Sequence, residues 1–267
     1  MEALEEKFLS SELISRMAPT PSGFLHLGNL TNFFFIHKII RQEKGKLWLR
    51  IDDCDGTRSR DSYVEHLFES LDFLELDWDS GPRDLTDFKN HFSQNLKRDK
   101  YFEKVQSLGD KIYACSCSRS EIGNQPYQGT CRHLNLAFDP GNTSLRLKVE
   151  DQQLLSEFGD VILWRKDDGP AYHLASVIDD LEMKVNLIIR GDDLEPSSRF
   201  QKYLALQFDS VGFSKVKFYH HPLLRDQNGE KLSKSRGVYS LVDLRAKGMT
   251  AAEIKDDLTR LTSDWKL

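Results

Sequence analysis

The sequence predicts an α/β fold in which an open parallel sheet binds a nucleotide at the carboxyl ends of its strands. Apolar runs at Leu47–Ile51 and Val185–Ile189 lie between helix-like segments, and each ends abruptly in charged residues, as buried parallel strands do. Upstream, a Pro- and Gly-rich loop at 16–29 leads from His26 directly into a helical apolar pattern. In open α/β sheets, ligands bind at strand ends beside helix N-termini.

The loop 16–29 predicts a phosphate site. Because it opens a helix, backbone N–H groups and the positive end of the helix dipole meet near His26, Gly28 and Asn29. A Walker A motif is excluded, since Asn29 and Leu30 stand where Lys and Ser or Thr would be, and no GxGxxG occurs. The loop therefore belongs to neither of these two nucleotide-binding types.

Apolar spacing predicts helices at 30–44 and 64–74, a third with Phe200 on its core face, and two short ones near the C-terminus. Thr250-x-x-Glu253 is a capping box. The expected caps, in order, are Gly45 as C′, then Ser59 or Asp61, Ser197 or Ser198, Ser240, and Thr250 at N-termini.

Residues 83–170 interrupt the α/β pattern, which predicts an insertion between two halves of one domain. A Lys- and Arg-bearing helix leads to clustered cysteines and then to strand-like pieces at 144–149 and 161–164. The predicted organisation is a nucleotide-binding catalytic domain at 1–82 and 171–230, the insertion at 83–170, and a short helical C-terminal segment at 231–267.

Composition bounds the class of protein. Of 267 residues, 30% are charged and 39% hydrophobic, an ordinary soluble balance. Lys and Arg number 37 against 42 Asp and Glu, so the net charge of −5 gives no global basic field, although local patches can still bind RNA. No run could span a membrane, and the first six residues are too acidic for a leader. Four cysteines, three of them clustered, favour a reducing compartment, so we expect a cytoplasmic protein. We also expect it to be a monomer and not to associate with a membrane.

A second motif, Lys231-Leu232-Ser233-Lys234-Ser235, lies about two hundred residues beyond the first. Alone, either motif is most often an ordinary solvated loop. In this order they resemble the HIGH and KMSKS signatures of class I aminoacyl-tRNA synthetases. The words Arg16-Met-Ala-Pro-Thr-Pro-Ser-Gly and Leu49-Arg-Ile-Asp-Asp resemble the glutamyl/glutaminyl branch of that family.

This resemblance implies a Rossmann-like class I synthetase domain, in which a glutamate carboxylate attacks the α-phosphorus of ATP. It also implies that the zinc-bearing insertion at 83–170 binds the acceptor, and that residues 231–267, with the KLSKS loop and short helices, contact the RNA stem. Such a site must position two anions and neutralise developing charge. His26 and Lys234 would stabilise the transition state, with Mg²⁺ on the leaving pyrophosphate. The implied ATP-binding residues are His26, Gly28, Asn29, Lys231, Ser233 and Lys234, and the implied glutamate-binding residues are Arg16, Ser22, Asp52, Tyr172 and Arg190.

Two positions depart from the family pattern. Asp52 stands where Glu is usual, so the expected ligand of the glutamate ammonium group is one methylene shorter, which leaves amino-acid selectivity open. Ser176 stands where full-length enzymes carry Asn. As a structural alternative, Asp52 and Arg190 would pair with each other or merely end their strands.

The cysteine group predicts a zinc site. Cys115-x-Cys117 and Cys131 have a spacing at which cytosolic thiolates usually bind tetrahedral zinc, and three thiols without metal are the alternative. General ligand rules would choose His133 as the fourth ligand. The pattern Cys-x-Cys…Tyr-x-Gly-x-Cys resembles the zinc site of glutamyl-queuosine tRNA(Asp) synthetases, which implies Tyr127 instead. Cys54 is expected to be a free thiol without a role.

The acceptor is inferred from the same resemblance. Only 32 residues follow Ser235, which leaves no room for the anticodon-binding domain of full glutamyl- and glutaminyl-tRNA synthetases. The shorter enzymes imply ATP-dependent activation of L-glutamate and its transfer to the queuosine base of tRNA(Asp). Three alternatives are a glutamyl-tRNA synthetase-like enzyme with another acceptor, a nucleotidyltransferase that makes a small molecule, and an RNA-binding paralogue with weak or no catalysis.

Overall fold

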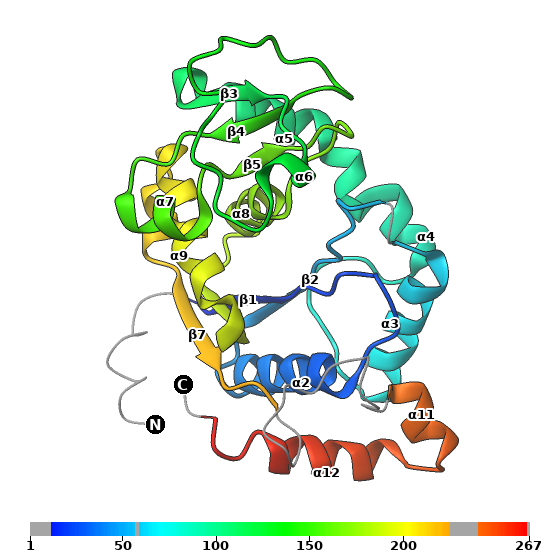
Figure 1. The fold of residues 1–267 in the computed structure, drawn as a ribbon. Helices are drawn as coiled ribbons and strands as arrows, with labels where there is room; N and C mark the ends of the chain where they lie inside the picture. Colours follow the sequence, from blue (N-terminus) through cyan, green and yellow to red (C-terminus); the bar gives the residue numbers. More distant parts are fainter. Residues whose placement is uncertain (1–11, 57–58, 225–239, 266–267) are drawn as a thin grey trace.

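Two pairs of parallel strands form the centre of the computed structural model, which describes residues 12–56, 59–224 and 240–265 (Figure 1). Asn186 joins the pairs, because its backbone N–H donates to Ile14 O at 3.0 Å and its Oδ1 accepts from Ile14 N–H at 2.8 Å. The α/β expectation is therefore confirmed. The pairs are β1 (Ile14–Met17) with β2 (Lys46–Leu49), and β6 (Leu187–Gly191) with β7 (Lys217–His221).

Helices surround these strands on both sides (Figure 1). No helix in the described ranges is long and apolar enough to cross a bilayer. In chain order the helices are α2 (Leu27–Gln42), α3 (Asp61–Phe73), α4 (Leu85–Asp87), α5 (Arg98–Gln106), α6 (Arg119–Ile122), α7 (Gln152–Phe158), α8 (Tyr172–Glu182), α9 (Glu195–Gln207), α10 (Val211–Ser214), α11 (Leu241–Ala246) and α12 (Ala251–Leu261). Short π- or 3₁₀-helical segments lie at Phe88–Phe92, Gln94–Lys97, Gly109–Lys111 and Asp192–Leu194.

Strand β6 separates two hydrophobic cores. Leu187 and Ile189 pack into the core that contains α2 and α3, whereas Ile188 packs into the core that contains α8 and α9. Successive side chains of a strand point to opposite faces. Because both faces of the strand are buried over Leu187–Ile189, this part of it is apolar, which explains the apolar run in the sequence, and Arg190 follows at its carboxyl end.

The segment between the two halves carries an antiparallel sheet in the order β3 (Ile112–Cys115), β4 (Ser144–Leu147), β5 (Ile162–Trp164), at the top of Figure 1. Its Leu145 and Leu163 pack in the same core as α8 and α9. The packing is thus continuous across residue 170, and the domain limits stay predictions.

The C-terminal helices pack on the α2 side of the strands (Figure 1). Ile254 and Leu258 of α12 join the core that contains α2. Trp265 stacks on His221, with ring centroids 3.9 Å apart and planes at 11°. Helix α12 and Trp265 are therefore packed into the same part of the molecule as α2 and β7.

The predicted caps Ser240 and Thr250 are confirmed, each in a capping box. Gly45 as C′ is wrong, because Lys44 adopts the left-handed conformation (φ 53°) after α2. Gly45 is needed for a close approach instead, since a Cβ there would lie 2.5 Å from Leu13 O.

The other predicted N-caps are also wrong. Arg60 precedes α3 without a side-chain capping bond, and Asp61 is already the first residue of that helix. Ser59 is therefore not a cap. Leu194 precedes α9, so Ser197 and Ser198 lie inside the helix, where Ser198 Oγ donates back to Leu194 O at 3.1 Å.

Candidate active site

His26 caps the helix that opens after the first predicted signature. Its Nδ1 accepts from Asn29 N–H at 3.3 Å, and Asn29 Oδ1 accepts from His26 N–H at 3.4 Å. Because Nδ1 is the acceptor, a neutral ring carries its proton on Nε2. Gly28 makes room for the ring, since a Cβ there would lie 3.0 Å from His26 Cε1. Of the predicted phosphate donors, the Asn29 N–H is thus already bonded to His26.

The second predicted signature, with Lys231, Ser233 and Lys234, lies outside the described residues. The chain on both sides of it contacts the first signature and its helix. Ser240 forms an antiparallel bridge with His26, and His221 Nε2 lies 3.0 Å from Asn32 Oδ1 of α2. The flanks of the two signatures, far apart in sequence, are therefore neighbours in space.

A cavity of about 280 Å³ lies where β1, β2 and β6 end. Four of the five predicted glutamate-binding residues, drawn from distant parts of the chain, line it together. Ser22 is exposed and is not among the lining residues. The lining consists of Arg16, Ala18, Thr20, Asn32, Arg50, Asp52, Tyr172, Ile189, Arg190 and Leu194.

Arg190 provides the cavity with a buried and incompletely bonded cation. Its side chain is only 4% exposed, and Nη2 donates to Gln201 Oε1 at 2.7 Å. Nε and Nη1 have no hydrogen-bond partner among the described residues. Burial lowers the pKa of Arg190 to about 10, with Tyr172 acting in the opposite direction, so the guanidinium remains charged at neutral pH. Buried N–H groups of this kind require an acceptor, and a charged one suits them best.

The facing wall is a buried network of two arginines and two aspartates. Asp180 Oδ1 accepts from Arg16 Nε at 3.0 Å and from Arg50 Nη1 at 2.7 Å. Arg50 also holds Asp52 through two bonds, of 2.6 and 3.1 Å. Asp52 therefore pairs with Arg50, and the alternative in which it pairs with Arg190 is wrong. Burial raises the pKa of Asp52, although the Arg50 charge opposes this.

Arg50 and Asp180 are two site residues that were not predicted from the sequence. Arg50 precedes Asp52 by two residues, and residues at that spacing lie on one face of an extended chain. Asp180 follows Tyr172 by eight residues on α8, which places both on one helix face. Either spacing could have indicated these side chains.

The three clustered cysteines meet around the Tyr127 hydroxyl. Their sulfur atoms all lie within 4.8 Å of one another, and tetrahedral zinc with thiolate ligands would place sulfurs about 3.8 Å apart. Tyr127 Oη lies 3.4 Å from Cys115 Sγ and 3.5 Å from Cys117 Sγ, and accepts from Cys131 N–H at 2.8 Å. The donor set and its spacing fit a zinc ion.

His133, the alternative fourth ligand, is exposed and lies outside this cluster, which among the described residues comprises three thiols. The backbone of Tyr127 packs directly against Gly159 (φ 65°). A side chain at that position would collide with the Tyr127 backbone, so only glycine permits this close approach. Burial raises the pKa of Cys131, but hydrogen bonds from Tyr127 and Ser116 outweigh it and bring the value to about 7. A partly ionised thiol suits metal binding.

Comparison with known proteins shows the family to which the chain belongs. Residues 12–152 and 141–261 match the family described as tRNA synthetases class I (E and Q), catalytic domain. A solved glutamate tRNA ligase from Elizabethkingia meningosepticum shares the fold, with a TM-score of 0.68 at 23% identity over 85% of this chain and 53% of that one. The chain belongs to the glutamate- and glutamine-type class I tRNA synthetases, a family of ligases.

Two curated relatives narrow the position within that family. Glutamyl-Q tRNA(Asp) synthetase of a Synechococcus species is 38% identical over 94% of this chain and 83% of its own length. Glutamate--tRNA ligase 2 of Acidithiobacillus ferrooxidans is 33% identical over 97% of this chain, which spans only 60% of that enzyme. Within its family, the chain belongs with the glutamyl-Q tRNA(Asp) synthetases.

Proposed function

We propose that this protein activates L-glutamate with ATP and transfers it to the queuosine base of tRNA(Asp). The observation that carries the first half of this proposal is the incompletely bonded Arg190, whose buried Nε and Nη1 have no hydrogen-bond partner among the described residues, in a cavity that also contains Arg16 and Arg50. A substrate with two carboxylates would supply the missing acceptors. A neutral side chain would leave a buried arginine unpaired, at a cost of several kcal/mol, so the site favours glutamate over glutamine.

The proposed chemistry depends on positioning. ATP would place its phosphates at the N-terminus of α2, where His26 and the positive charges of Lys231 and Lys234 would neutralise the developing negative charge. His26 is prepared for this role, because its Nδ1 bond to Asn29 leaves the proton on Nε2. Mg²⁺ would accompany the pyrophosphate. Glutamate would be held by Arg16, Asp52, Tyr172 and Arg190.

The proposed acceptor rests on the relatives. Two proteins named Glutamyl-Q tRNA(Asp) synthetase are 38% and 36% identical over 94% and 90% of this chain. We also propose that the cysteine cluster and Tyr127 hold one Zn²⁺, and that the protein acts as a cytoplasmic monomer. The competing proposal, supported by the glutamate ligases among the relatives, is an enzyme that charges another RNA.

ATP–pyrophosphate exchange across all amino acids tests the proposal, and we expect exchange with glutamate alone. His26→Ala should lower it about 10²- to 10³-fold, since one lost donor to transition-state charge costs that much. Radioactive glutamate should label queuosine-containing tRNA(Asp) and not unmodified glutamate tRNA. Near-normal exchange by His26→Ala and Lys234→Ala variants would contradict the catalytic assignment, and labelling of glutamate tRNA alone would favour the competing function.

Asp52→Glu tests how the glutamate ammonium group is bound. The extra methylene moves the carboxylate roughly 1.5 Å further into the cavity, so the KM for glutamate should fall by about tenfold, or about 1.4 kcal/mol. Asp53→Glu is the matched control, because Asp53 bonds to Ser93 and Gln94 away from the cavity. A higher KM in Asp52→Glu would instead show that the hydrogen bonds between Asp52 and Arg50 matter more for glutamate binding than the length of the side chain at position 52.

A further inference from the structure

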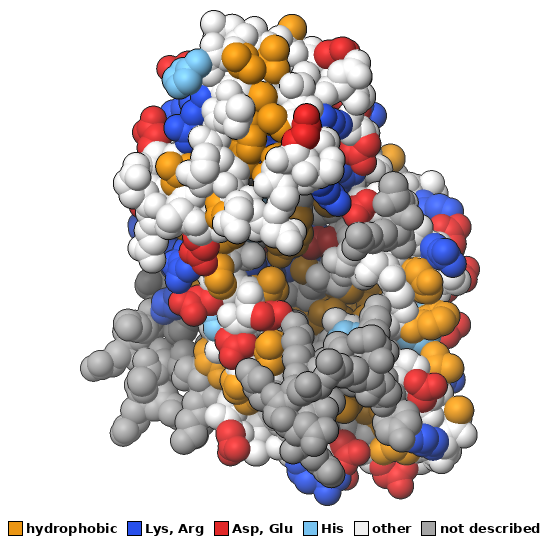
Figure 2. All heavy atoms as spheres, viewed as in Figure 1, with side chains coloured by type: hydrophobic (Ala, Val, Ile, Leu, Met, Phe, Trp, Pro, Cys, Tyr) orange, Lys and Arg blue, Asp and Glu red, His pale blue; other side chains and the backbone are white. Residues whose placement is uncertain are grey.

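Buried charges are concentrated in and next to the glutamate cavity. On the face of the molecule in Figure 2, charges of both signs are mixed over the surface, where water solvates them. A buried charge has no such solvent and needs partners within the protein. Each of the charges near the cavity must therefore be held by particular donors or acceptors. The buried charged residues of this region are Arg16, Arg50, Asp52, Asp53, Asp179, Asp180 and Arg190.

Gln94 is a neutral side chain that connects several of these charges. It is 1% exposed and begins the short 3₁₀-helical segment Gln94–Lys97, between the two pairs of parallel strands in sequence. Its Nε2 donates to Asp52 Oδ1 at 3.3 Å and to Asp179 Oδ2 at 2.9 Å. Its Oε1 accepts from Cys54 N–H at 3.0 Å. A primary amide offers two donors and an acceptor on one end group, which neither a carboxylate nor an apolar side chain can do.

Asp179 fixes the orientation of this amide. The Asp179 carboxylate is fully buried, and besides Gln94 it accepts from Tyr101 Oη at 2.8 Å and pairs with Lys97 Nζ at 3.0 Å. An ionised carboxylate can only accept, and the backbone N–H of Cys54 can only donate. The amide therefore cannot be reversed without losing its bonds, so Gln94 directs an N–H group toward Asp52.

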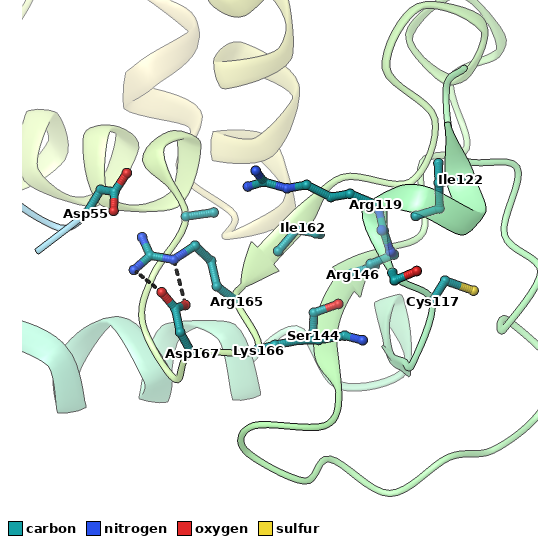
Figure 3. A pocket seen from close by; sticks show the side chains of 12 residues that line it. Asp55, Cys117, Arg119, Ile122, Ser144, Arg146, Ile162, Arg165, Lys166 and Asp167 are labelled. Carbon is teal, nitrogen blue, oxygen red and sulfur yellow. Dashed lines mark hydrogen bonds and ion pairs between the residues drawn. The ribbon is translucent and has the colours of Figure 1, made fainter. Parts of the chain in front are cut away.

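The backbone beyond β2 has further supports that do not involve the Gln94 side chain. Cys54 O accepts from Arg165 Nη1 at 3.0 Å. Arg165 is itself held by two bonds to Asp167, of 2.8 and 3.1 Å, which Figure 3 draws as dashed lines in a pocket that both residues line. The Asp53 carboxylate accepts from the backbone N–H of Gln94 at 2.7 Å. A change of the Gln94 side chain should therefore act mainly on the carboxylates that it contacts.

The bond from Gln94 completes the support of the Asp52 carboxylate. Arg50 donates two bonds to this carboxylate and Gln94 donates a third. A carboxylate has about four lone-pair sites, so within the described part of the chain a site remains for an ammonium group. Without the amide, Asp52 and Asp179 would face each other as like charges across the space that the amide fills, and the Asp52 carboxylate would shift.

We propose that Gln94 is a positioning residue for amino-acid binding, which holds the Asp52 carboxylate where it receives the ammonium group of the substrate. Gln94 is not among the residues that line the glutamate cavity, so it acts through Asp52 and does not touch the substrate. The inference rests on the proposed function, in which Asp52 is the ammonium ligand.

Gln94→Met tests this inference in ATP–pyrophosphate exchange, because Met keeps the length of the side chain and lacks its hydrogen-bonding groups. The KM for glutamate should rise by about tenfold, as expected for a lost bond to a charged group. The kcat should stay within about twofold of the wild-type value, since binding of the ground state and of the transition state is weakened alike. Gln94→Asn keeps the amide but shortens its reach, and should give a similar rise, so the result does not depend on the folding of one variant.

Asn95→Leu is the matched control. It removes the neighbouring amide, whose Nδ2 donates to Asp53 O at 3.2 Å and to Asp53 Oδ2 at 3.0 Å and not to Asp52. We expect a lower melting temperature with a wild-type KM for glutamate. An equal rise of KM in Asn95→Leu and Gln94→Met would show a general loss of structure and would overturn the positioning role, as would an unchanged KM in Gln94→Met.

A double-mutant cycle with Asp52→Ala tests whether Gln94 acts through Asp52. In the Asp52→Ala background, Gln94→Met should lower kcat/KM for glutamate no further, because the group that it positions is already absent. Additive effects of the two substitutions would show independent roles and would overturn the inference.

Failure of the proposed function would appear in the wild-type protein. Exchange with an amino acid other than glutamate would reject that function, but every amino acid has the same ammonium group, so the same variants would then test Gln94 with that amino acid. Exchange with no amino acid at all would overturn both the proposed function and the role of Gln94.

Discussion

Arg190→Met should raise the KM for glutamate in pyrophosphate exchange by about 100-fold or more. The variant removes the two buried nitrogen atoms, Nε and Nη1, that no described residue satisfies, and two lost charge-assisted hydrogen bonds are worth about 3 kcal/mol or more. The fold should tolerate the change. Loss of the bond to Gln201 destabilises it by about 1–3 kcal/mol, but removal of an incompletely paired buried charge offsets this.

Lys202→Met is the matched control for this experiment. Lys202 Nζ and Arg190 Cζ each lie 4.9 Å from the centroid of the Phe218 ring, but Lys202 does not line the glutamate cavity. We expect a wild-type KM for this variant and similar melting temperatures for both. An equal rise of KM in the two variants, or an unchanged KM in Arg190→Met, would remove Arg190 from the substrate site.

Cys131→Ser should abolish zinc binding and destabilise the region around β3, β4 and β5. Binding energy at a structural zinc site is also folding energy, about 10–16 kcal/mol in small zinc peptides at neutral pH, so we expect a loss of several kcal/mol here. Metal analysis measures the zinc content, and thermal unfolding measures the loss of stability. A strong chelator should cause the same loss of stability in the wild-type protein. Cys54→Ser is the control, since burial raises the pKa of that thiol to about 12 and it lies apart from the cluster.

The choice of fourth ligand has its own pair of variants. Tyr127→Phe removes the hydroxyl that lies 3.4 and 3.5 Å from two of the sulfurs, and we expect it to weaken zinc binding, whereas His133→Ala should bind one zinc per chain as the wild-type protein does. Loss of zinc only from His133→Ala would reverse the assignment. Full zinc content in Cys131→Ser would reject the site altogether.

Local patterns predicted those parts of the fold that depend on neighbours in sequence. The strand predicted at Val185–Ile189 from an apolar run lies at Leu187–Gly191, two residues later, and its apolar residues are buried on both faces. The capping boxes at Ser240 and Thr250 followed from a side chain three residues away. Where no such local bond forms, as at Arg60 and Leu194, the predicted caps were wrong.

The sequence alone was sufficient to identify the sequence motifs of the family and to select Arg16, Asp52, Tyr172 and Arg190. The structure brings these four residues to one cavity. Which partner each charge has was decided only by tertiary structure. Asp180 reaches Arg16 and Arg50 across more than a hundred residues, and no periodicity encodes a contact of that range. The pairing of Arg132 with the Asp160 carboxylate arises in the same way, and Arg146, which packs over Tyr127, then bonds to the backbone oxygen of Asp160. A buried ion pair depends on three-dimensional distance and desolvation, and these exist only once the chain has folded.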